Sequence, residues 1–111
     1  MVRTAPRQDE IWLVKLDPTL GSEMRKTRPC LVVSPDEMND PLRTVMVAPL
    51  TTAERPYPTR IRIRFQGKTG QIALDQIRSV DQSRAVKKLG RITDTMAASV
   101  STLLVEMFRR N

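Results

Sequence analysis

The sequence contains no histidine, and this absence limits the chemistry that the protein can perform. Histidine is the commonest general base near neutral pH and the commonest metal ligand in proteins. Any catalysis must therefore use Arg, Asp, Glu, Ser, Thr, Tyr or Lys side chains. The sequence also has no glycine-rich phosphate loop, no Cys/His cluster with zinc spacing and no calcium-loop spacing of acidic residues. We therefore expect neither a metal nor a cofactor.

Cysteine is almost absent too, since Cys30 is the one cysteine in the sequence. A single cysteine cannot form an intramolecular disulfide. The place of Cys30 in an apolar run predicts that it is a small buried hydrophobe rather than a nucleophile. No apolar leader opens the sequence, and no apolar run approaches the ~20 residues that cross a bilayer. We expect a soluble, cytoplasmic protein that does not contact membranes.

Acidic residues are too few to balance the basic ones, because 12 Asp and Glu face 19 Lys and Arg and leave a net charge of +7. Such a charge attracts polyanions, above all nucleic acid, although solubility alone also tolerates it. Aromatic residues make up only 4% of the sequence, so few rings could stack on bases. Hydrogen bonds and arginine stacking would then carry any base selection.

The length of 111 residues fits one domain. Residues 1–8 lack hydrophobic periodicity and predict a frayed basic tail, which leaves a single domain over residues 9–111. Period-two or apolar runs predict strands, and one helical turn is expected over Asp36–Asn39. The predicted strands are Glu10–Leu16, Pro29–Ser34, Thr44–Leu50, Tyr57–Phe65, Gln71–Asp81 (with a bend near Asp75) and Ala85–Ile92. Gly67 and Gly70 are expected to bracket a turn.

The C-terminal segment changes period, because its apolar residues recur every three or four positions. This spacing is typical of an amphipathic helix, and Thr93 or Asp94 can cap its N-terminus. The apolar positions are Met96, Val100, Leu103, Leu104 and Met107.

Two strand ends carry the strongest functional candidates. Segments 27–35 (TRPCLVVSP) and 48–52 (APLTT) place Arg28 and Thr51 where an apolar strand meets a loop. Two further patterns are open to either a functional or a structural interpretation. Arg60, Arg62 and Arg64 could track successive phosphates or form a solvated outer face. Asp75 could be a carboxylate of raised pKa that serves as a base, or a turn-forming or salt-bridged residue.

A basic protein without metal ligands can still cleave RNA, because the substrate supplies its own nucleophile, the 2′-hydroxyl group. The protein must then supply a base, cations for the charge that develops at phosphorus, and a donor for the leaving oxygen.

Four segments, taken in order, resemble the MazF/PemK/Kid family of toxin endoribonucleases. They are residues 10–23 (EIWLVKLDPTLGSE), 28–34 (RPCLVVS), 47–58 (VAPLTTAERPYP) and 74–81 (LDQIRSVD), within a match over about residues 9–108. The resemblance implies an α+β, mainly β fold, a small SH3-like β-barrel of the CcdB/PemK type with a C-terminal α-helix. It also implies a homodimer that cleaves single-stranded RNA sequence-specifically and without metal, as an mRNA interferase, to 2′,3′-cyclic phosphate and 5′-hydroxyl ends. The implied partner is a MazE-like antitoxin with an acidic C-terminal tail.

The resemblance also implies site residues. Arg28 and Thr51 match the catalytic pair, Asp75 matches the general base proposed in the Kid branch, and Glu23 is a second candidate base. Candidate RNA-binding or supporting residues are Glu10, Arg25, Lys26, Thr52, Arg60, Arg62, Gln76 and Arg78. The chain departs from the Kid branch at Ala73, where that branch has arginine, and at Ser22, where it has histidine. Arg28 must therefore take the cationic role, and the base stays open.

Two rival functions remain open from the sequence. One is a non-enzymatic gyrase inhibitor like CcdB, which shares this barrel; the C-terminal segment 108–111 (FRRN) lacks the ending on which that activity depends. The other is an RNA-binding module that leaves RNA intact, against which the retention of Arg28 and Thr51 argues.

Overall fold

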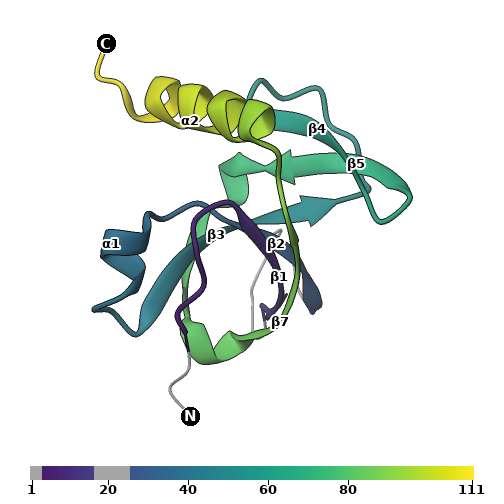
Figure 1. Ribbon diagram of the computed structural model, residues 1–111. Coiled ribbons are helices and arrows are strands. Elements are labelled where there is room, and N and C mark those ends of the chain that lie inside the picture. The colour runs from purple at the N-terminus through teal and green to yellow at the C-terminus, as the bar shows by residue number, and fades with distance from the viewer. Residues whose placement is uncertain (1–3, 17–25) are drawn as a thin grey trace.

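The computed structural model describes residues 4–16 and 26–111, and its main feature is a curled antiparallel sheet with a helix across one end (Figure 1). The strands are β1 (Glu10–Lys15), β2 (Thr27–Val32), β3 (Thr44–Thr51), β4 (Arg60–Phe65), β5 (Lys68–Ala73), β6 (Arg78–Asp81) and β7 (Ala85–Arg91). The helices are α1 (Asp36–Asn39) and α2 (Asp94–Phe108), with 3-10 turns η1 (Leu74–Gln76) and η2 (Gln82–Arg84). The predicted mainly β, SH3-like fold with a C-terminal helix is confirmed.

Strand β3 is the centre of the sheet, and it exchanges one neighbour for another along its length. Its first half, Thr44–Val47, pairs with β6, whereas Leu50 and Thr51 pair with β5. On its other edge β3 pairs with β2, and the sheet continues through β1 to β7. Because β5 and β6 diverge from one central strand, the sheet curls on itself (Figure 1).

Side chains on the two sides of this sheet form two apolar clusters. The first contains Ile11, Leu31, Ile63, Ile72 and Leu74, and the inner face of α2 packs against it. The second consists mainly of valines, together with Leu16 and Cys30. Their burial explains why β3 is apolar on both faces. Cys30 is buried as predicted, and this burial raises the pKa of its thiol to about 12.

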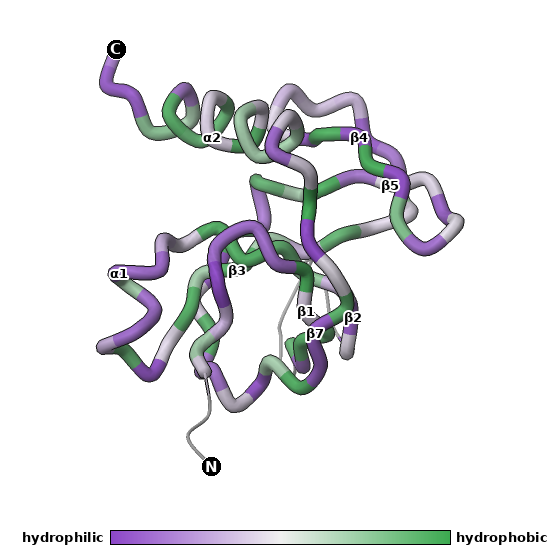
Figure 2. The backbone as a smooth tube through the Cα atoms, in the orientation of Figure 1, coloured by the Kyte–Doolittle hydropathy of each residue, from purple (hydrophilic) through white to green (hydrophobic). Residues whose placement is uncertain are grey.

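Helix α2 begins as the sequence predicts. The Thr93 hydroxyl accepts a hydrogen bond from the Met96 amide at 3.2 Å, which satisfies one of the unpaired donors of the first turn. Hydrophobic and hydrophilic residues alternate along the helix (Figure 2), and Val100 faces the core. Within the described part of the chain, no helix is both long and apolar enough to cross a membrane.

Two strand predictions and one turn prediction need correction. The predicted strand Gln71–Asp81 is divided by η1 at the expected bend, so that its halves, β5 and β6, pair with different parts of β3. Gly70 lies inside β5 rather than in the turn, which consists of Gln66 and Gly67 at positive φ. Strand β4 begins at Arg60, because the preceding prolines cannot donate ladder hydrogen bonds.

The prediction of a frayed tail is wrong for the residues next to the domain. Pro6 is fully buried, and its carbonyl accepts a hydrogen bond from Asn39. Arg7 forms ion pairs with Asp36 and Asp40, at the start and just after the end of α1. The positive charge of Arg7 is therefore matched by acidic residues at both ends of α1.

Candidate active site

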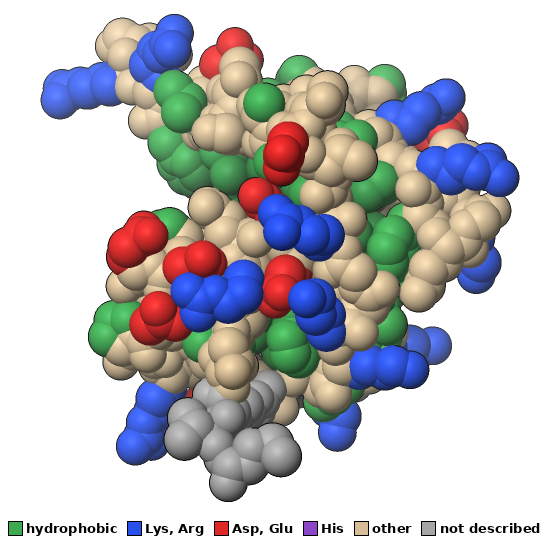
Figure 3. Space-filling view, viewed as in Figure 1, with side chains coloured by type: hydrophobic (Ala, Val, Ile, Leu, Met, Phe, Trp, Pro, Cys, Tyr) green, Lys and Arg blue, Asp and Glu red, His purple; other side chains and the backbone are tan. Residues whose placement is uncertain are grey.

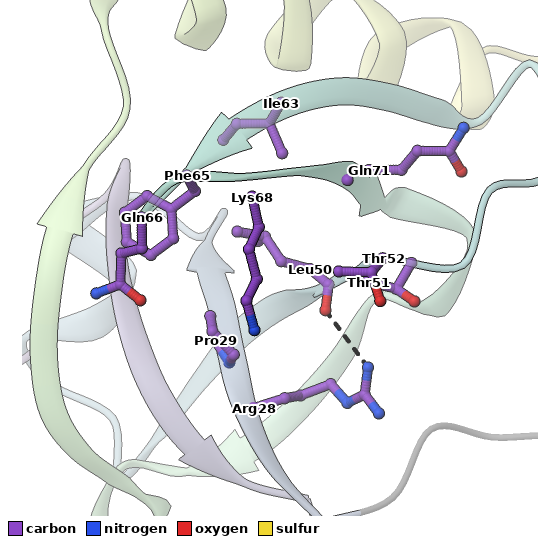
Figure 4. A pocket seen from close by; sticks show the side chains of 11 residues that line it. Arg28, Pro29, Leu50, Thr51, Thr52, Ile63, Phe65, Gln66, Lys68 and Gln71 are labelled. Carbon is purple, nitrogen blue, oxygen red and sulfur yellow. Dashed lines mark hydrogen bonds between the residues drawn. The ribbon is translucent and has the colours of Figure 1, made fainter.

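A cavity of about 240 Å³ opens where β2, β3 and the β4–β5 hairpin meet (Figure 4). It is lined by Arg28, Pro29, Leu50, Thr51, Thr52, Ile63, Phe65, Gln66, Lys68, Gly70 and Gln71. Arg28 and Thr51 lie at strand ends, as the sequence pattern predicted, and although they are twenty-three positions apart in the sequence they line one cavity. Both walls combine apolar side chains, such as Ile63 and Phe65, with polar ones. Such a cavity can accommodate a flat, partly apolar group attached to an anion.

The two candidate catalytic side chains are held by backbone groups. The Arg28 Nη1 atom lies 3.5 Å from the Leu50 carbonyl oxygen, to which it donates from the neighbouring strand (Figure 4). The Thr51 hydroxyl accepts a hydrogen bond from the Ala53 amide at 3.1 Å, which fixes its rotamer while the side chain borders the cavity. A guanidinium and a hydroxyl so placed can donate to the oxygens of one phosphodiester group.

Gly70 allows β5 to approach Thr51 closely. A Cβ atom built on Gly70 would lie 2.4 Å from the Thr51 carbonyl oxygen, well inside van der Waals contact. No side chain fits at this position unless the backbone of β3 or β5 moves. Gly70 therefore sets the distance between the Thr51 end of β3 and the opposite wall of the cavity.

Gln71 fixes the loop that follows Thr51. Its side-chain Oε1 accepts a hydrogen bond from the Arg55 amide, and its Nε2 donates to the Arg55 carbonyl, both at 3.1 Å. The side chain thus pairs with Arg55 as a neighbouring strand would. It holds the loop that begins with Thr52, another residue that lines the cavity.

Asp75 does not line the cavity but forms an ion pair with Arg60, at 2.7 Å between Oδ1 and Nε. Only 5% of the Arg60 side chain is exposed, and Arg60 also donates to Gln71 and stacks over Tyr57. Burial alone would raise the pKa of Asp75, but the hydrogen bond and charge of Arg60 outweigh it and lower that pKa. The hypothesis of a raised pKa is wrong, and the salt-bridged alternative is confirmed.

The other predicted RNA-binding residues lie elsewhere or are already engaged. Glu10 is buried, and its carboxylate accepts from the Arg7 amide and the Trp12 indole and pairs with Lys88 at 2.8 Å. Burial opposes ionisation of Glu10, yet these donors lower its pKa, so its role in this structure is supporting.

The remaining cationic candidates differ in their contacts. Arg62 pairs with Glu54 on the exposed surface, so the face of β4 is less cationic than its sequence suggests. Arg78 donates to the Leu16 carbonyl at 3.4 Å, and Lys26 precedes β2 at positive φ. Gln76, a further candidate, is half-buried in η1 and does not line the cavity.

Two of the candidates, Glu23 and Arg25, lie outside the described residues. In the part of the chain that the structure describes, no three Cys, Asp or Glu side chains gather in a way that could hold a metal ion. Acidic and basic side chains adjoin one another on the face seen in Figure 3, in keeping with the ion pairs around α1 and Glu10.

The sequence did not indicate the wall that the β4–β5 hairpin contributes to the cavity. Lys68 and Gln71 line the cavity from this hairpin, together with Ile63 and Phe65. The alternation of residues 57–65 placed Ile63 and Phe65 on the buried face, but no pattern indicated that this face borders Arg28 and Thr51. That contact depends on the curl of the sheet.

The matches to known proteins agree with one another. Residues 7–108 match the model of the PemK-like, MazF-like toxin family of type II toxin-antitoxin systems. The endoribonuclease PemK of Escherichia coli is 37% identical over 97 residues, which cover 82% of this chain and 73% of that protein.

Solved structures extend this agreement to the fold. The crystal structure of MazF from Deinococcus radiodurans is 26% identical, with a TM-score of 0.81 over 93% of this chain and 96% of that one. A crystal structure of MazE–MazF from the same organism contains a chain that is 25% identical, with a TM-score of 0.77 over 93% of this chain and 95% of that one. This chain therefore belongs to the PemK-like, MazF-like toxin family of type II toxin–antitoxin systems.

Proposed function

We propose that this protein is an endoribonuclease that cleaves single-stranded RNA sequence-specifically, without metal, and leaves 2′,3′-cyclic phosphate and 5′-hydroxyl ends. The observation that carries the proposal is that Arg28 and Thr51 border one cavity, each held by a backbone hydrogen bond. Membership of a family that contains the endoribonuclease PemK of Escherichia coli supports it.

In the proposed reaction the 2′-oxygen of RNA loses its proton to a base and attacks the adjacent phosphorus. The bond from phosphorus to the 5′-oxygen breaks, and that oxygen gains a proton. Arg28 stabilises the charge that develops on the phosphoryl oxygens and protonates the leaving oxygen directly or through water. Thr51 donates a hydrogen bond to the scissile phosphate, and Thr52 extends this contact along the cavity rim.

Two carboxylates are candidates for the base. Asp75 is ionised in the ion pair with Arg60, but its lowered pKa makes it a weak proton acceptor. Glu23 belongs to the segment before Arg28, and we propose it as the first candidate. Replacing each by its amide and measuring kcat against pH will separate the two, because loss of the base removes the acidic limb of the profile.

The remaining predicted candidates take secondary roles in this proposal. Arg25 would contact RNA, and Lys26 and Arg78, which do not line the cavity, would contact it elsewhere. Arg60 and Gln76 would support the wall near η1, whereas Arg62 would contact RNA only by exchanging its ion pair with Glu54.

We propose further that the protein acts as a cytoplasmic homodimer that an antitoxin with an acidic tail inhibits. Two residues on α2 support a subunit contact, because Val105 and Phe108 are 54% and 69% exposed. The family assignment and the +7 charge support an acidic partner. Light scattering of the free protein will test the dimer.

The decisive experiment incubates the purified protein with a long RNA in EDTA and identifies the new ends by mass spectrometry. We expect cuts that end in a cyclic phosphate and that disappear in Arg28→Ala and Thr51→Ala. Arg43→Ala and Thr102→Ala, matched replacements at exposed positions outside the cavity, should cleave normally. RNA that is bound but left intact by the unaltered protein would instead indicate a binding module.

A further inference from the structure

Lys68 enters the cavity from the wall opposite Arg28. It is the first residue of β5 and pairs with Phe65, the last residue of β4. The two residues between them, Gln66 and Gly67, both have positive φ, as in the tight turns that match the twist of a hairpin. The turn therefore fixes the direction in which Lys68 leaves the sheet, and Figure 4 shows its side chain extending across the cavity toward Pro29 and Arg28.

The Lys68 ammonium group differs from the other cations of its hairpin in its contacts. Within residues 4–16 and 26–111 it makes no hydrogen bond or ion pair. By contrast, Arg60 and Arg62 of the same hairpin are both paired with carboxylates. The hairpin thus neutralises two of the three arginines of β4, holds the third, Arg64, against the Thr69 hydroxyl, and directs Lys68 into the cavity.

Arg28 and Thr51 together suffice for one phosphodiester group, which has two non-bridging oxygens and one negative charge. Lys68 reaches the same cavity from another strand, and its flexible stem carries a point charge that suits a phosphate of variable position. A single RNA strand that threads the cavity has a phosphate on each side of the scissile one.

We propose that Lys68 binds the backbone phosphate next to the scissile phosphate and so fixes the strand across Arg28 and Thr51. This inference rests on the proposed RNA cleavage. It makes Lys68 a substrate-binding residue whose contribution is electrostatic and insensitive to base identity.

The test measures kcat and KM for RNA cleavage at several salt concentrations with Lys68→Gln, Lys68→Arg and Lys87→Gln. Lys87 is an exposed lysine on β7 that does not line the cavity, so its replacement removes the same charge at another place. One phosphate contact to a single strand contributes about 0.7 to the slope of log affinity against log salt. We expect Lys68→Gln to raise KM and to reduce the slope of log(kcat/KM) by about this amount, while Lys68→Arg and Lys87→Gln keep the original slope.

Three results would overturn the inference. Equal effects of Lys68→Gln and Lys87→Gln would show that only net charge matters. A fall in kcat with unchanged KM would assign Lys68 to the reaction itself rather than to a neighbouring phosphate. If the unaltered protein leaves RNA intact, the proposed function fails first and the role of Lys68 falls with it.

Discussion

Polar side chains of similar kinds gather around both ends of β3, but their contacts differ between the two ends. At the Thr44 end, Ser34, Asn39 and Gln82 direct their polar atoms to protein groups: Asn39 donates to two carbonyl oxygens, and Gln82 to three. At the Thr51 end, Arg28 and Thr51 each make a backbone hydrogen bond and also border a cavity. Polar residues at the first end complete the fold, whereas those at the second also line a cavity.

The sharpest test of this contrast is Arg28→Ala. We expect the rate of RNA cleavage to fall about 10²- to 10³-fold, since one preorganised donor to a developing charge is lost. The unfolding midpoint in urea should change little, because the side chain is half-buried and its hydrogen bond to Leu50 is long. A large loss of stability would show that the two ends are not functionally distinct.

The opposite pattern is expected for Asn39→Ala. This residue is fully buried, and truncation leaves the Pro6 and Ser34 carbonyls without their donor. The free energy of unfolding should fall by about 2–4 kcal/mol, as measured by urea denaturation. Cleavage per folded molecule should be retained at a temperature where the variant is folded. Loss of cleavage in the folded variant would connect α1 to the site.

Gly70→Ala should affect both properties. The new methyl group meets the Thr51 carbonyl at 2.4 Å, so β3 and β5 must separate. We expect about 1–3 kcal/mol of destabilisation together with slower cleavage, because Thr51 moves. Gly90→Ala is the control, since its methyl group would lie 3.5 Å from Phe65, an ordinary contact. A Gly70→Ala variant of normal activity would mean that the strands tolerate a wider spacing.

The smallest effect is expected for Asp75→Asn. The pKa of Asp75 is lowered in the folded protein, so its ionised form stabilises the fold above about pH 4 and this contribution disappears as the pH falls. At pH 7 the free energy of unfolding of the variant should be about 1 kcal/mol lower than that of the unaltered protein. The two proteins should converge in acid, once the Asp75 carboxylate is protonated in the folded state as well. Urea denaturation across this pH range measures the difference. A constant difference would contradict the ion-pair interpretation.

Much of this architecture follows from local patterns, which explains where prediction succeeded. The alternation of residues 57–65, the apolar run of β3 and the cap at Thr93 each depend on neighbours in the sequence. The site was predicted only in part. Arg28 and Thr51 carry a strand-end signal. Lys68 and Gln71 lie at the cavity because β3 pairs with β6 along its first half and with β5 at its end, and no local sequence pattern encodes this change of partner. Asp75 was ambiguous because its partner, Arg60, is fifteen positions away.

The wall that holds Lys68 and Gln71 is joined to β3 by a short ladder. Strands β4 and β5 pair at six positions with each other, but β5 pairs with β3 only at Leu50 and Thr51. The hairpin also packs on the core through Ile63 and Ile72, but its ladder with β3 is much shorter than its own, so we expect the ladder with β3 to open more readily. Amide hydrogen exchange should accordingly be faster at Ile72 than at Leu31, although both side chains are fully buried.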